Sequence, residues 1–465
     1  MLVCGRKYKM AESKSILTAL ILVSISITAG YGANPTLQVI KLEIPPLDVE
    51  DSAGGIIAAD VNNDNKPDYL VTVRGHLAVY DNSGRKLWLK KTDIAVGGQS
   101  ESEGLPGHHG PGNAAGDVDN DGKTEVIYLT RDSVLHIVDG ATGKQEASAT
   151  APLPEDASRW EIAMIADFRG TGKDNDILLQ ATNKSGYRMG KYLAAYEIEI
   201  LLKGGKPLWT TDSFVSCAHN GARIADLDGD GKDEVLGVTI FSPAGKLITR
   251  AIEDRYHADS IFVADVKPEL PGLEMVMLEE GANQVQVISL TGPVWRNHFK
   301  KQEPQNAAVG KFKENSDEVF IWCRSRYNEH QKPFVFDSKG NKVFDYEMDN
   351  VAPEGWTASG VEVIHTIDWT GREQQLACAK ERHTSGDVCL FEPLTGKFVL
   401  RLPEKADRLY VADTTGDWRE EIVVLNGSEL HIYKNKDPNP HPDHKRLWEN
   451  RNYRRLKQCH NYYSP

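Results

Sequence analysis

A short acidic turn recurs along almost the whole chain and limits the folds that the chain can adopt. The clearest copy is Asp226-Leu-Asp228-Gly-Asp230-Gly-Lys-Asp-Glu234, with carboxylates at positions 1, 3, 5 and 9. Alternate carboxylates on a tight turn can point at one centre, which suits a hard cation such as calcium. An EF-hand would need a bidentate Glu at position 12 and flanking helices. Residues 235–240 instead have the pattern of a strand, so this copy is a turn between strands.

Eight copies of the turn follow one another at intervals of roughly 40–60 residues. The copies that begin at residues 60, 117 and 226 are the best formed, whereas those at 167, 310 and 368 have lost too many carboxylates to bind well. We expect structural Ca²⁺ sites that tie the first strand of each unit to the second. The predicted ligands are Asp60, Asn62, Asp64, Asp68, Asp117, Asp119, Asp121, Glu125, Asp226, Asp228, Asp230, Glu234, Asp413, Asp417 and Glu421.

The segments around each turn repeat the same pattern of strands. A short apolar strand leads into the turn and another follows it, and a third strand, a second turn and a fourth strand that often holds Trp complete the unit. Four strands per unit at this period are typical of a β-propeller blade. We therefore predict an all-β fold with one propeller of about eight blades, or seven if one weak copy is not a full blade. A strand at 37–42 would complete the last blade and close the ring.

The composition is that of a soluble globular protein of 465 residues, and the net charge of −13 argues against a nucleic-acid partner. Basic residues between positions 6 and 14 precede an apolar run at 16–27 and small residues at 29–33, which predicts a signal peptide over 1–33. Met10 is an alternative start. The run is too short for a membrane span, so we expect the protein to be secreted or periplasmic. We also expect a monomer.

The propeller is expected over residues 34–440, followed by a basic, aromatic tail at 441–465. Such a tail can bind an anionic sugar chain or pack across the propeller, and we favour packing. Five cysteines follow the signal, and the odd number leaves at least one unpaired. Cys378 and Cys389 flank a predicted hairpin and could form a disulfide. Alternatively, Cys323, His330, Cys378, His383 and Cys389 could hold a structural Zn²⁺.

Three histidines occupy nearly the same place in the repeat. His109, His219 and His257 lie eight, seven and eight residues before the first Asp of an acidic turn. In a propeller, residues just before the first strands converge at the channel mouth, opposite the acidic turns. Tyr187 and Arg188 lie in a predicted hairpin loop on the same face. These histidines could instead cap strands, and the loop could be a solvated hairpin tip.

His, Tyr and Arg together suggest β-elimination on a uronic-acid polysaccharide. The C5 proton of a uronate is too weakly acidic to leave unaided, so charge building on the carboxylate must be stabilised, and Arg188 can do this. A base must take the proton and an acid must protonate the leaving oxygen. His109, His219, His257 and Tyr187 are the candidates for these two transfers. Hydrolysis would usually require a carboxylate pair, and the acidic residues are mostly committed to the turns.

The stretch from residue 186 to residue 280 resembles the propeller of rhamnogalacturonan lyases of polysaccharide lyase family 11. The matching elements include Gly186-Tyr187, Leu208-Trp209, His219 with the turn at Asp226, and His257-Ala-Asp with the turn at Asp265. The resemblance implies an eight-bladed, calcium-binding propeller that cleaves a rhamnose–uronate backbone. The chain has no room for the extra β-domain of those lyases.

A chain of this length that consists of one exported propeller is also similar in build to ulvan lyases, which cut a sulfated rhamnose–uronate polymer. The resemblance therefore implies an anionic polysaccharide substrate, and on architecture alone we place ulvan slightly ahead of rhamnogalacturonan. The rival class is a non-catalytic, calcium-binding propeller for glycan binding or adhesion.

Overall fold

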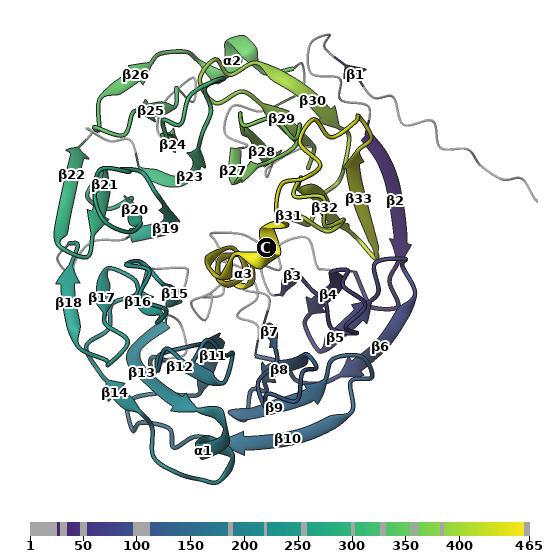
Figure 1. The fold of residues 1–465 in the computed structure, drawn as a ribbon, viewed down its shortest axis with the longest axis vertical. Helices are drawn as coiled ribbons and strands as arrows, with labels where there is room; N and C mark the ends of the chain where they lie inside the picture. Colours follow the sequence, from purple (N-terminus) through teal and green to yellow (C-terminus); the bar gives the residue numbers. More distant parts are fainter. Residues whose placement is uncertain are drawn as a thin grey trace, which may run out of the picture.

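The computed structural model describes residues 26–27, 35–46, 54–95, 112–184, 189–217, 221–252, 258–298, 303–325, 332–353, 356, 361–381 and 386–459. Within these residues, eight antiparallel sheets surround a common axis, which confirms the predicted β-propeller with eight blades (Figure 1). Seven sheets have four strands, and the seventh blade gains a fifth, short strand β1 (Ser26–Ile27). None of the described helices is long and apolar enough to cross a membrane.

The first four blades follow the order of the chain, with the first strand of each blade innermost (Figure 1). The first blade consists of β3 (Gly55–Ala59), β4 (Asp68–Val73), β5 (His76–Tyr80) and β6 (Lys86–Lys91), and the second of β7 (Asn113–Gly116), β8 (Glu125–Leu129), β9 (Val134–Asp139) and β10 (Gln145–Thr150). The third blade consists of β11 (Trp160–Ala166), β12 (Asp176–Thr182), β13 (Met189–Glu197) and β14 (Trp209–Thr211), with helix α1 (Ile198–Leu202) before β14. The fourth blade consists of β15 (Arg223–Ala225), β16 (Glu234–Leu236), β17 (Thr239–Phe241) and β18 (Leu247–Arg250).

The last four blades are built in the same way, and a helical tail follows them. The fifth blade consists of β19 (Ala258–Ala264), β20 (Glu274–Glu279), β21 (Gln284–Ser289) and β22 (Gly292–His298). The sixth blade consists of β23 (Pro304–Gly310), β24 (Phe320–Ser325), β25 (Phe334–Phe336) and β26 (Lys342–Phe344), and helix α2 (Met348–Val351) follows it. The seventh blade consists of β27 (Val361–Ile367), β28 (Leu376–Glu381), β29 (Val388–Phe391) and β30 (Phe398–Leu402), and the eighth of β31 (Arg408–Ala412), β32 (Glu421–Asn426), β33 (Glu429–Asn435) and β2 (Pro35–Lys41). The tail holds η3 (Leu447–Glu449) and α3 (Arg451–Gln458).

The ring is closed by a strand from the other end of the chain. β2 pairs with β33 along its whole length, with Leu37 opposite Tyr433. This pairing confirms the prediction that the N-terminal strand completes the last blade. Because the first and last segments share one sheet, neither end of the propeller can separate without breaking a complete strand ladder.

The hydrophobic core consists of eight clusters, each between two neighbouring blades. Ile57 of the first blade and Val126 of the second, for example, are fully buried in one cluster. Both faces of a blade are therefore covered. This explains why consecutive residues of inner strands such as β3, β7 and β31 are all buried, rather than every second one.

The tryptophans of the fourth strands contact the next blade. Trp88 Nε1 donates to the carbonyl of Gly140 at 2.7 Å. A Cβ at Gly143, whose φ is +67°, would lie 2.6 Å from the Trp88 ring, so this turn needs glycine. The arrangement recurs with Trp209, Pro243 and Gly245, and with Trp295, Ser338 and Gly340. The repeated Trp and the repeated turn glycine thus form one contact between consecutive blades.

Candidate functional site

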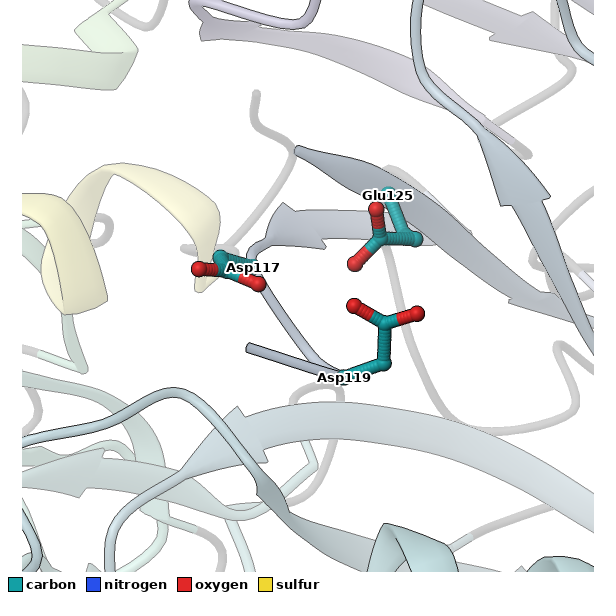
Figure 2. A group of neighbouring side chains, drawn as sticks. All are labelled: Asp117, Asp119 and Glu125. Atoms are coloured by element: carbon teal, nitrogen blue, oxygen red, sulfur yellow. The ribbon is translucent and has the colours of Figure 1, made fainter. Parts of the chain in front are cut away.

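Each of two acidic turns brings three of its own carboxylates together. Figure 2 shows the group in the second blade, where one oxygen each of Asp117, Asp119 and Glu125 lies within 4.8 Å of the others. Asp226, Asp228 and Asp230 converge in the same way in the fourth blade. Calcium binds oxygen at about 2.3–2.6 Å, so one ion can contact oxygens that are about 5 Å apart. These donor sets fit a calcium ion.

The backbone of the turn holds the carboxylates in place. Asp119 Oδ1 accepts the N–H of Asp121 at 3.0 Å, and Asp117 Oδ2 accepts the N–H of Gly122 at 3.1 Å. Asn120 and Gly122 have φ angles of +64° and +87°, which favour Asn and Gly over other residues. Asp117 Oδ1 is buried and has no hydrogen-bond partner within the described part of the chain. It is therefore available to a cation.

The carboxylate at position 9 also closes the turn by a hydrogen bond. Glu125 Oε2 accepts the N–H of Val118, the second residue of the turn, at 2.9 Å. The same bond joins Asp68 to Val61, Glu234 to Leu227, Glu274 to Val266 and Glu421 to Thr414. Burial raises the pKa of Glu125 and Glu234 to about 7. In Glu125 and Glu234 one oxygen is thus a structural acceptor, and the other remains for a metal.

Protein cations contact the carboxylates of two other turns. In the third blade, Arg169 stands at turn position 3 and pairs with Asp176 and Glu197, each at 2.8 Å. In the eighth blade, Arg419 holds Asp417 through two N–H groups at 3.0 and 2.6 Å. An arginine that donates to a carboxylate compensates part of the negative charge of the turn without a metal ion.

All five predicted catalytic residues, His109, Tyr187, Arg188, His219 and His257, lie outside the described residues. The structure does show where the neighbouring strands begin. β7, β15 and β19 end at the acidic turns, so their first residues, at positions 113, 223 and 258, lie at the opposite face of the ring. The strand geometry on which the prediction rests is therefore present.

Two buried carboxylates at this opposite face were not singled out from the sequence. Asp259 and Glu279 have no exposed surface, and Glu279 pairs with Ala258 on the neighbouring strand. Glu279 accepts the N–H of Ala282, and buried carboxylates occur both in structural networks and at functional sites. The available signals were the position of Asp259 two residues after His257 and the place of Glu279 at the end of an apolar run.

Residues just before the second strands connect consecutive blades near the acidic turns. In three blades the side chain at this place accepts the N–H of the residue that follows the first strand of the preceding blade. Asp233 binds Asp167 N at 2.7 Å, Gln375 binds Lys311 N at 2.9 Å and Glu420 binds Asp368 N at 3.0 Å. Leu273 and Pro67 hold this place in the fifth and first blades, and neither side chain is a hydrogen-bond acceptor.

Helix α3 lies at the centre of the ring (Figure 1) and supplies acceptors where Leu273 and Pro67 provide none. Asn452 Oδ1 accepts Asp226 N at 3.0 Å, and Tyr453 Oη accepts Asp413 N at 2.9 Å. Gln458 contacts both backbone groups of Ala115. These contacts are those expected for a tail packed on the propeller, and they join the second, fourth and eighth blades.

The disulfide between Cys378 and Cys389, one of the alternatives that the sequence left open, is not formed. Cys378 and Cys389 do lie on the two strands of a hairpin, but both thiols are free and buried. Cys378 pairs with Leu390, and Ala379 pairs with Cys389, so the two thiols point to opposite faces of the sheet. Cys323, Cys378 and Cys389 belong to three different clusters, and His330 and His383 lie outside the described residues.

Comparison with known families identifies the chain. A family model described as rhamnogalacturonan lyase family 11, C-terminal domain, matches residues 209–462, which is more than half of the chain. The chain belongs to rhamnogalacturonan lyase family 11. An FG-GAP-like repeat model also matches residues 60–128, which hold the first two acidic turns of this family 11 chain.

Two relatives from Bacillus subtilis (strain 168) match this family 11 member. The rhamnogalacturonan endolyase YesW is 25% identical over 386 residues, covering 70% of this chain and 57% of YesW. The rhamnogalacturonan exolyase YesX is 24% identical over 268 residues, covering 53% of this chain and 42% of YesX. The chain thus spans about half the length of these curated relatives.

Solved structures show the same fold. The crystal structure of YesW superposes with a TM-score of 0.64 at 19% identity, covering 92% of this chain and 80% of that one. The V. cholerae biofilm matrix protein Bap1 superposes with a TM-score of 0.52 at 13% identity, covering 86% and 92%. Similarity at this level of identity shows the propeller architecture alone.

Proposed function

We propose that this protein cleaves the backbone of a rhamnogalacturonan by β-elimination at a uronic acid. The observation that carries the proposal is the family match over residues 209–462. The printed names of both relatives, an endolyase and an exolyase of rhamnogalacturonan, support the same substrate class. Ulvan, favoured by architecture alone, is the second substrate to test, because it shares the rhamnose–uronate chemistry.

The proposed reaction uses the face of the ring opposite the acidic turns. His109, His219, His257 and Tyr187 are the candidates for removing the C5 proton and for protonating the leaving oxygen. Arg188 is proposed to stabilise charge on the uronate carboxylate. Asp259 and Glu279 are buried beside the start of β19, where they can orient a histidine or compensate a cation near the substrate.

Calcium is proposed as a structural ion of the acidic turns. The converging carboxylates of the second and fourth blades would hold it, and it would neutralise their mutual repulsion. We also propose that the protein is exported, on the basis of the N-terminal pattern. According to this proposal, the acidic turns stabilise the ring, and the residues of the opposite face catalyse the β-elimination.

The proposal is tested by following the ultraviolet absorbance of the unsaturated uronate product. Purified protein is incubated with rhamnogalacturonan I and with ulvan, and we expect product from the former. His219→Ala should lower the initial rate by about 10²–10⁴-fold, the range for loss of a proton-transfer group. His298→Ala, on the exposed outer strand β22, should retain full rate. Full activity in the His219 variant would overturn the site assignment, and binding without product would favour the non-catalytic alternative.

A further inference from the structure

A buried glutamine lies between the third and fourth blades, at the face of the ring opposite the acidic turns. Gln180, near the end of β12, has no exposed surface. It follows Leu178 by two residues, so both side chains lie on the same face of the third blade. Leu178 packs there in one cluster with Ile224 of the fourth blade. A polar amide in line with apolar residues is costly unless its groups are hydrogen-bonded.

Both ends of this amide have backbone partners. Gln180 Oε1 accepts the N–H of Ala222 at 2.7 Å, and Gln180 Nε2 donates to the carbonyl of Gly190 at 3.0 Å. Ala222 directly precedes β15 of the fourth blade, and Gly190 lies near the start of β13 in the third blade. One side chain thus connects the backbone of two segments that belong to different blades.

Two glycines allow the backbone to come this close to the amide. A Cβ at Gly221 would lie 1.8 Å from Ile162 Cδ1 and 2.9 Å from Gln180 Oε1. A Cβ at Gly190 would lie 2.7 Å from the carbonyl oxygen of Thr182. Neither position can accept a larger residue unless its segment moves, so glycine is required for close approach at both places.

The hairpin of β12 and β13 is irregular beside this glutamine. Gln180 pairs with Leu193 and Thr182 pairs with Met189, so residues 190–192 of β13 stand opposite residue 181 alone. Irregularities of this kind re-aim side chains and are common next to active sites. The bond from Gln180 to Gly190 lies within the irregular part of the hairpin and holds it.

The two anchored segments follow predicted site residues in the sequence. Ala222 comes three residues after His219, and Gly190 comes two residues after Arg188. We propose that Gln180 is a positioning residue of the lyase site, which holds the backbone after His219 and the backbone after Arg188 in a fixed relation. The inference rests on the proposed function. Because Gln180 has no exposed surface, it acts through these segments and not by contact with the substrate.

A related contact anchors the segment after a second predicted histidine. Asn113 Nδ2 donates to Thr72 Oγ1 at 2.8 Å, and Thr72 has no exposed surface. Thr72 lies near the end of β4, the second strand of the first blade, as Gln180 does in β12 of the third. Asn113 begins β7, four residues after His109. In both cases a polar side chain of the preceding blade fixes the start of an inner strand.

The test compares Gln180→Met with a matched control, Gln375→Met. Gln375 also joins two blades with both ends of its amide, because its Oε1 accepts Lys311 N at 2.9 Å and its Nε2 donates to Asp368 at 3.0 Å. It lies at the acidic turns, away from the proposed site. Both variants should have lower melting temperatures than the native protein. On rhamnogalacturonan I, Gln180→Met alone should lose kcat, by about 10–10²-fold, with KM nearly unchanged.

Hydrogen exchange followed by mass spectrometry gives a readout that does not depend on activity. In Gln180→Met, peptides that cover residues 189–193 and 221–225 should both exchange faster than in the native protein, and in Gln375→Met neither should. If Gln180→Met does not fold, Gln180→Asn, whose amide reaches one methylene less far, should show the same changes, with Gln375→Asn as its control.

Unchanged exchange in either peptide would overturn the proposal, as would full kcat in the Gln180 variant of an active enzyme. Absence of product from the native protein has a different meaning, because it overturns the proposed function and with it the catalytic role of Gln180. Faster exchange in both peptides would even then support the anchoring of the two segments by this side chain.

Discussion

Replacing Arg455 by Met is expected to destabilise the propeller from its centre. Arg455 is 5% exposed; its Nη2 lies 2.6 Å from Asp174 Oδ1 and its Nε lies 3.3 Å from Asp233 Oδ2. Asp233 has no exposed surface and accepts a backbone N–H of the third blade. The substitution keeps most of the packing volume but leaves both carboxylates with less positive charge.

The magnitude follows from the cost of breaking a buried ion pair, which is about 3–5 kcal/mol. Arg451 stays 2.9 Å from Asp233, and the Asp174 side chain is 26% exposed to water, so both carboxylates keep some compensation. We therefore expect a loss at the lower end, about 3 kcal/mol of the free energy of unfolding. Urea denaturation followed by tryptophan fluorescence measures it.

The matched control removes the cation of an exposed ion pair. Lys203 and Glu199 of helix α1 are 65% and 67% exposed. Lys203→Met should change the free energy of unfolding by no more than about 0.5 kcal/mol, because exposed helical pairs contribute little. An Arg455→Met loss as small as that of the control would refute the view that α3 is an integral part of the ring.

Three further predictions concern the turns, a buried histidine and the tail. A chelator of divalent cations should lower the melting temperature, because the carboxylates of the acidic turns then repel one another. The chelator should lower the melting temperature of Asp228→Asn by less. An equal decrease in that variant would contradict calcium binding at this turn. A hydrogen bond to Glu404 raises the pKa of His431 above 6.5, so this histidine contributes stability fully below pH 6.5 and loses it as the pH rises through its folded pKa. Melting curves of His431→Gln should thus differ most from the native protein at mildly acidic pH, and a difference that grows above pH 6.5 would be inconsistent with this sign. Tyr453→Phe should cost about 1–3 kcal/mol in urea denaturation, because the N–H of Asp413 loses its acceptor; no measurable loss would mean that water replaces the hydroxyl.

The repeated turns were sufficient to predict the architecture from the sequence. Each turn carries its own local signals, carboxylates at fixed spacing and residues such as Asn120 and Gly122 that adopt positive φ angles. Eight such signals between apolar strands identify eight blades. The closing strand β2 could also be predicted, because a propeller leaves its last blade incomplete unless the other end of the chain supplies a strand.

The role of the tail could not be derived in the same way. The partners of α3 are backbone groups of Ala115 and Asp226, which lie 343 and 226 residues away in the sequence from Gln458 and Asn452. Backbone groups leave no trace in the pattern of side chains. The missing acceptors at Pro67 and Leu273 were visible in the sequence, but their meaning depends on knowing which residue faces them in the neighbouring blade.

The state of the cysteines could not be derived from the sequence for a similar reason. The hairpin that connects Cys378 and Cys389 was predicted correctly, but a disulfide also requires a register that places both side chains on the same face of the sheet. The register opposes Cys378 to Leu390, so the thiols enter different clusters on either side of the blade. A shift of one residue would have reversed this, and the register depends on the turn geometry and on which side chains each strand buries against its neighbours.

The most direct test of the proposed function is the initial rate of unsaturated uronate formation from rhamnogalacturonan I. The account predicts an absorbance that rises with time, scales with protein concentration and is accompanied by shorter oligosaccharides. Binding of the polysaccharide with no rise in absorbance, at any calcium concentration, would contradict the proposal that this family 11 propeller is a lyase.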